Sequence, residues 1–100
     1  MHYYVIGDQD TVLGFSLVGV SGMQATNPGE AKAAWNGALA DKENGIIIIT
    51  EDVADMIRST VDRYLFSESF PLVVEIPATG KEGKGRDLRE LVNQAIGVSL

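Results

Sequence analysis

Four consecutive isoleucines, Ile46 to Ile49, constrain the fold more than any other feature of the chain. The run does not alternate polar and apolar residues, so it predicts a strand whose two faces are both covered, as in a parallel sheet between helices. Thr50 then offers an N-cap residue, and Glu51 and Asp52 place negative charge in the first turn of a helix. A strand that passes directly into a helix is typical of a βα unit.

The rest of the first 77 residues continues this alternation. Asn27, Pro28 and Glu30 form a helix start in which Asn27 caps, Pro28 takes the first helical position and Glu30 reaches back toward the cap. Short β-rich runs and apolar residues at helical spacing mark the other elements. We expect strands over residues 3–6, 20–24, 46–49 and 72–76, and helices over residues 9–18, 28–39 and 51–64.

These elements predict an α/β fold with a four-stranded parallel sheet in the order 2-1-3-4, flanked by helices. The isoleucine run suits a central strand, and the weak run at 20–24 suits an edge. Right-handed crossovers place helices on both faces, and we expect the layers of this domain, residues 1–77, to be closed. Residues 78–85 contain three glycines and predict a flexible linker, which is followed by a C-terminal helix within residues 86–100.

The predicted C-terminal helix is the strongest candidate for an interaction site. A helix of about 11 residues is marginal alone, so it docks either on its own domain or on a partner helix, and periodicity leaves both alternatives open. The charge changes at the linker: residues 1–80 hold four Lys/Arg against eleven Asp/Glu, whereas residues 81–100 hold four against three. The apolar stripe of this helix consists of Leu88, Leu91, Val92, Ala95 and Ile96.

No complete catalytic constellation is visible in the sequence. The chain has no cysteine, which excludes disulfides, thiolate catalysis and Cys-bound zinc. Its one histidine, His2, lies at the terminus, so a Ser-His-Asp triad is improbable. The G-x-x-x-x-G-K-[ST] motif is absent, and the first turn has one glycine where a dinucleotide fingerprint has three. We therefore expect no cofactor and no catalysis.

Four carboxylates, Asp8, Asp10, Glu51 and Asp52, follow predicted strands, at the edge where open α/β sheets bind ligands. Such a cluster could hold a hard cation such as magnesium. Ordinary helix-start chemistry explains the same residues, and we favour that interpretation and expect no metal. We interpret Arg58 and Arg63 as solvated residues of the third helix.

The net charge of −6 disfavours nucleic acid and anionic lipid as partners. The first residues lack the basic region of a signal peptide, and no apolar segment approaches the roughly 20 residues needed to span a bilayer. We therefore expect a soluble cytoplasmic protein with no direct membrane insertion.

Motifs in a fixed order along nearly the whole chain resemble the F subunit of the V/A-type rotary ATPases, the archaeal and vacuolar types. Each motif is weak alone, but the ordered set is distinctive. The motifs are V-I-G-D-x-D-T-V-x-G-F-x-L-x-G-V at 5–20, G-I-I-I-I-T-E-D-V-A with I-R at 45–58, P-L-V-V-E-I-P at 71–77 and L-V-x-x-A-I-G-V at 91–98.

The resemblance implies a receiver-like domain in a non-catalytic central-stalk subunit of a proton- or sodium-translocating rotary ATPase or ATP synthase. The F subunit of that family binds the long coiled coil of the D subunit, and it relates only indirectly to the A/B catalytic ring and the membrane-sector stalk subunit. Its C-terminal helix lies along the D subunit and modulates the coupling of ATP turnover to ion transport. Carried over to this chain, the partner-binding positions are those of the apolar stripe, Leu88 to Ile96, in a complex peripheral to the membrane.

Two other classes of function remain open. A degenerate receiver domain, acting as a signalling or interaction module, would use Asp8 and Asp10 as its acidic pair. Its phosphoacceptor position at the end of the third strand holds Ile49 and Thr50, however, and the fifth strand with its lysine is absent. A small α/β enzyme would need a nucleophile and a base that the sequence does not offer.

Overall fold

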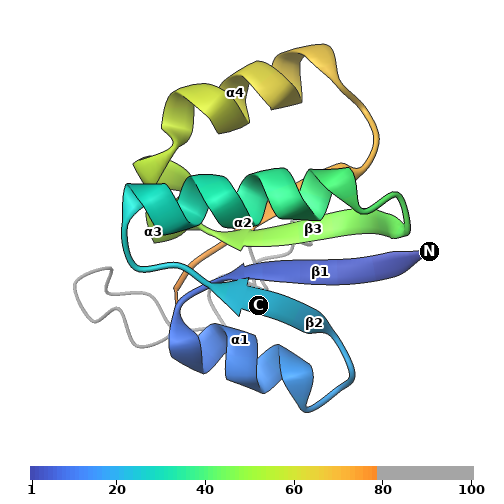
Figure 1. Cartoon of the computed structure of the whole chain (residues 1–100), viewed down its shortest axis with the longest axis vertical. Helices are drawn as coiled ribbons and strands as arrows, with labels where there is room; N and C mark the ends of the chain where they lie inside the picture. The colour runs from blue at the N-terminus through green and yellow to red at the C-terminus, as the bar shows by residue number, and fades with distance from the viewer. Residues whose placement is uncertain (79–100) are drawn as a thin grey trace, which may run out of the picture.

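The computed structural model describes residues 1–78, which form a single four-stranded sheet with all strands parallel, in the order β2-β1-β3-β4 (Figure 1). The fold class, the strand order and the central positions of β1 and β3 confirm the sequence predictions. The predicted helix at 86–100 and all of the linker after Ala78 lie outside the described residues. The elements are β1 (His2–Gly7), α1 (Gln9–Ser16), β2 (Ser21–Gln24), α2 (Pro28–Ala40), β3 (Asn44–Thr50), α3 (Glu51–Met56), α4 (Arg58–Ser67) and β4 (Leu72–Ile76).

Helices lie on both faces of the sheet, but in unequal numbers. α2, α3 and α4 lie on one face, and α1 lies alone on the other (Figure 1). α1 packs against β1 and β2. We call the two sides the three-helix face and the α1 face.

The main core lies between the sheet and the three-helix face. Ile47 and Ile49 of β3 are fully buried there, in one cluster with Trp35 of α2. Side chains alternate along a strand, so Ile46 and Ile48 point to the α1 face, where they are only half-buried. Within residues 1–78, the expectation of covered faces and closed layers therefore holds only on the three-helix face, because one helix does not cover the α1 face of four strands.

The helix predicted over 51–64 is two helices in the structure. Ile57 leaves helical geometry, with φ −129° and ψ 40°, and joins α3 to α4. Its side chain is only 7% exposed, so the bend places it in the core. The ring of Trp35 meets Tyr64 of α4 edge to face, with centroids 5.4 Å apart, and the Tyr64 hydroxyl donates a hydrogen bond of 2.7 Å to the Pro71 carbonyl. These contacts hold α2, α4 and the start of β4 together.

The start of α2 agrees with its prediction except in one hydrogen bond. The Glu30 amide donates to the Asn27 side chain at 2.8 Å, and Pro28 begins the helix. The Glu30 carboxylate reaches one residue beyond the cap and accepts from both the amide and the hydroxyl of Thr26, each at 2.8 Å. These hydrogen bonds, the backbone bond first, lower the pKa of Glu30 below its ordinary value.

We predict that Glu30→Gln lowers the melting temperature at neutral pH and that this difference disappears in acid. The folded pKa lies below the unfolded value, so the stabilisation is complete above the unfolded value of about 4.5 and is lost as the pH falls through the folded pKa. Circular dichroism melts of both chains between about pH 7 and pH 2 measure it. A difference that persists at the lowest pH contradicts the assignment.

The two isoleucines at the centre of the run allow a matched test of the unequal faces. We predict that Ile47→Ala lowers the free energy of unfolding by about 3–5 kcal/mol, and Ile48→Ala by roughly 1–2 kcal/mol, because only Ile47 leaves a cavity in a closed core. Urea unfolding followed by the fluorescence of Trp35, the only tryptophan, measures both values. Equal losses would mean that the two faces are covered alike.

Candidate functional site

The carboxyl ends of the parallel strands come first, because ligands of open α/β sheets bind there. Asp8, after β1, caps α1: its carboxylate accepts hydrogen bonds from the Thr11 amide at 3.2 Å and from the Thr11 hydroxyl at 2.6 Å. Asp10 is exposed in the first turn of the same helix. Within residues 1–78, no three carboxylate or imidazole side chains gather closely enough to hold a metal ion. The carboxylate of Asp8 is thus already occupied with the start of α1.

Thr50, at the end of β3, precedes α3 as predicted, but its side chain does not cap the helix. Its hydroxyl is fully buried and has no hydrogen-bond partner among the described residues. Gly7 of β1 lies against it, since a Cβ on Gly7 would come 2.6 Å from Thr50 Cγ2. Asp52 accepts a hydrogen bond of 2.9 Å from the Val53 amide. The ends of β1 and β3 are therefore in close contact, which leaves little space for a ligand between them.

Arg58 and Arg63 both reach solvent, as predicted, but Arg58 is only 36% exposed in its side chain and also binds three carboxylates, which the prediction missed. The guanidinium makes two parallel hydrogen bonds to Glu75 of β4, at 2.7 and 3.0 Å. It also contacts Asp55 of α3 at 2.6 Å and Asp62 of α4 at 3.2 Å. Hydrogen bonds to Glu75, and then to Asp55, raise the pKa of Arg58. The cluster ties α3 and α4 to the end of β4.

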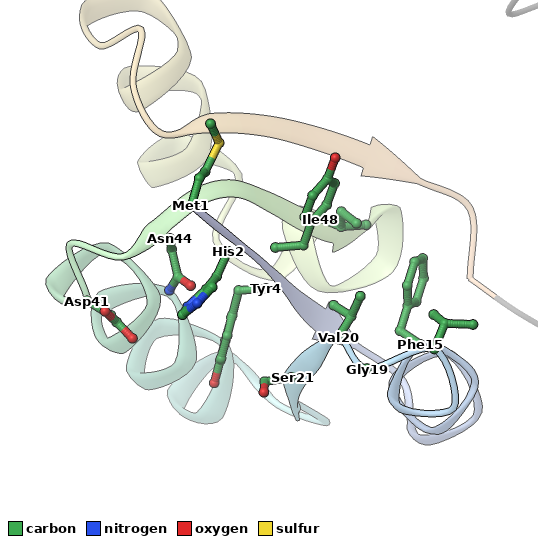
Figure 2. Close-up of a pocket in the computed structure, with 12 residues that line it drawn as sticks. Met1, His2, Tyr4, Phe15, Gly19, Val20, Ser21, Asp41, Asn44 and Ile48 are labelled. Atoms are coloured by element: carbon green, nitrogen blue, oxygen red, sulfur yellow. The ribbon is translucent and has the colours of Figure 1, made fainter.

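A hollow of about 660 Å³ surrounds the amino-terminal end of β1. In Figure 2, His2, Tyr4, Asp41 and Asn44 lie on one side of the strand, and Ile48 lies on the other. Two of the polar side chains hold the turn between α2 and β3. Asp41 accepts from the Glu43 amide at 3.0 Å, and Asn44 donates to the Ala38 carbonyl at 3.0 Å. The hollow thus wraps around a strand end and does not form one enclosed site.

An exposed apolar surface on the α1 face is the feature that sequence reasoning missed. Tyr3, Ile46 and Leu72 are neighbours across β1, β3 and β4, and Ile48 and Val74 are neighbours one row further along. Tyr3 is 52% exposed, Leu72 54% and Val74 39%, while Ile46 and Ile48 are half-buried. We call these five residues the open strip. Only the predicted strand order could have indicated this surface. That order places one of the three crossover connections, and so a single helix, on the α1 face.

The residues predicted to bind a partner lie outside the described part of the chain: they are Leu88, Leu91, Val92, Ala95 and Ile96. The structure therefore brings none of them to the body, and their role stays a prediction. No helix within residues 1–78 is both long and apolar enough to cross a membrane.

Comparison with known proteins decides the family. A family model described as the ATP synthase (F/14-kDa) subunit matches residues 4–92, nearly the whole chain. The chain belongs to the family of F subunits of A-type and V-type ATP synthases and ATPases. This confirms the resemblance seen in the sequence motifs, and it gives the chain a place in an ATP synthase or ATPase complex.

Individual members of the family match over most of their length. The chain is 37% identical over 99 residues to the F subunit of the A-type ATP synthase of Methanothermobacter thermautotrophicus, covering 96% of this chain and 92% of that protein. It is 33% identical to the F subunit of a V-type ATP synthase of Clostridium botulinum, covering 96% and 93%. A probable F subunit of the V-type proton ATPase of Caenorhabditis elegans is 38% identical over 86 residues, covering 74% and 69%. The similarity thus spans archaeal, bacterial and animal members.

We predict that the Arg58 cluster derives most of its stabilisation from Glu75. A double-mutant cycle with Arg58→Met and Glu75→Gln should give a coupling of about 1–2 kcal/mol, because this pair is bidentate and partly shielded from solvent. Cycles that pair Arg58→Met with Asp55→Asn and with Asp62→Asn serve as controls, and each should give a coupling below about 0.5 kcal/mol because exposed pairs are weak. Urea unfolding measures all variants, and equal couplings for the three carboxylates would contradict the assignment.

Proposed function

We propose that the chain is a non-catalytic central-stalk subunit of a V/A-type rotary ATPase or ATP synthase, where it binds the coiled-coil D subunit and modulates the coupling of ATP turnover to proton or sodium transport. The family match over residues 4–92 carries this proposal. That match includes the body and much of the predicted C-terminal helix, so it supports one role for both parts.

The residues at the carboxyl ends of the parallel strands support a binding role over a catalytic one. Asp8 is engaged with Thr11, and the Thr50 hydroxyl is buried against Gly7. A phosphate-accepting receiver domain would need a carboxylate where Ile49 and Thr50 stand. The polar groups at this edge are thus used in helix starts and strand contacts, which suits a body that presents surfaces to other subunits.

In the proposed arrangement, the body is a fixed block and the C-terminal helix extends from it along the shaft. The Arg58–Glu75 pair holds the end of β4, from which the linker leaves at Ala78. The stripe from Leu88 to Ile96 then contacts the D subunit. The A/B catalytic ring and the membrane-sector stalk subunit are reached only through that shaft, so the chain acts on the cytoplasmic side, peripheral to the membrane.

A matched pair of double substitutions tests the proposal. Leu88→Ser with Leu91→Ser should weaken binding of the full chain to the D subunit of the same organism by about 2–5 kcal/mol, because it removes two apolar anchors. Isothermal titration calorimetry measures the affinity. Leu13→Ser with Leu17→Ser is the control, since these leucines of α1 and its C-cap are 59% and 80% exposed.

Three outcomes contradict the proposal in different ways. Failure of the unsubstituted chain to bind the D subunit would remove the stalk role altogether. Unchanged affinity after the C-terminal substitutions would remove the role of the stripe. A melting temperature lowered by several degrees, with no loss of affinity, would show that the helix packs on its own domain.

A further inference from the structure

We propose that the open strip is a second binding surface for the coiled-coil partner, and that it takes one helix whose apolar stripe is flanked by lysine or arginine residues. This inference rests on the proposed function, which makes the D subunit the partner. It adds a surface on the body to the one expected on the C-terminal helix.

The dimensions of the open strip fit a single helix. Its residues come from β1, β3 and β4, which are adjacent strands of one sheet. Neighbouring strands lie about 4.8 Å apart, so three strands span about 10 Å, close to the 10–12 Å diameter of a helix with its side chains. Tyr3 and Leu72 stand at the two sides of the strip, and both expose more than half of their surface. A helix laid beside α1 would cover both.

The charges around the open strip indicate which side chains should flank the apolar stripe of the partner helix. All four lysine and arginine residues of the described chain belong to α2, to the turn that follows it, or to α4; they are Lys32, Lys42, Arg58 and Arg63. No strand within residues 1–78 carries a lysine or arginine, and neither does α1, whose first turn holds Asp10. The body is also strongly acidic as a whole. An apolar helix with basic flanks is therefore complementary to this face, whereas an acidic helix would be repelled.

The chain's own C-terminal helix is the alternative occupant of the open strip. In the proposed function the stripe of that helix lies on the D subunit, so it cannot cover the strip at the same time. The predicted linker, residues 78–85, can span at most about 29 Å, which would keep a shaft bound by the C-terminal helix close to the body. The strip would then remain exposed beside the coiled coil unless the coiled coil itself covers it.

Photocrosslinking distinguishes these occupants without removing any apolar contact. A benzoylphenylalanine in place of Tyr3, in the full chain mixed with the D subunit, should form a crosslink to that partner. The same group in place of Phe66, which is 94% exposed on α4 of the three-helix side, is the control and should form little. A crosslink from position 3 to the chain's own C-terminal segment, to a second copy, or to nothing would overturn the inference.

Affinity gives the second readout. Leu72→Ser with Val74→Ser in the full chain should weaken binding to the D subunit at least tenfold, while Leu65→Ser with Phe66→Ser, at exposed positions of α4 on the three-helix face, leaves it unchanged. Circular dichroism establishes that each variant is folded, and the crosslink at position 3 decides the matter should the double variant unfold. If the unsubstituted chain does not bind the coiled-coil partner, the proposed function fails and this inference fails with it. The unsubstituted chain could instead bind the D subunit while position 3 forms no crosslink to it and the substitutions at Leu72 and Val74 leave the affinity unchanged. In that case the open strip is not a binding surface, and the proposed function stands.

Discussion

The handedness of the crossover connections decides which side of the sheet each helix covers. The strand order β2-β1-β3-β4 sends the first connection to one edge and the next two toward the opposite edge. α1 therefore lies on one face, and α2, α3 and α4 lie on the other (Figure 1). A helix is about 10 Å wide, so α1 can shield only about two strands. The dense core, the half-buried isoleucines and the open strip all follow from this one constraint.

The sequence predicted the position of β3 well, but not the environment of its side chains. Four isoleucines without alternation indicate a central strand, and β3 is central. Ile47 and Ile48 are chemically identical, however, and only the arrangement of the helices makes one fully buried and the other half-buried. A run of apolar residues shows that both faces of a strand can be buried. It does not show whether helices cover both faces of the sheet.

Local interactions were predictable and distant ones were not. The cap of α2 depends on Asn27 and Glu30, three residues apart, and the sequence shows that pattern directly. Arg58 binds Glu75, seventeen residues away, and nothing in the spacing of the two indicates it. The bend at Ile57 was likewise missed, because apolar positions continue with helical spacing on both sides of it. The C-terminal stripe was identified by periodicity, its partner came from family resemblance, and both stay predictions.

The pairing of β4 with β3 determines how the end of the body resists a pulling force. β4 lies parallel to β3 along its full length, and the described chain ends two residues beyond it, at Ala78. A pull on that end directed along the strand loads the hydrogen bonds between β3 and β4 in shear, all at once, instead of opening them one by one. The Arg58–Glu75 pair transfers part of the same load to α4. The end of the body is thus reinforced against a pull directed along β4.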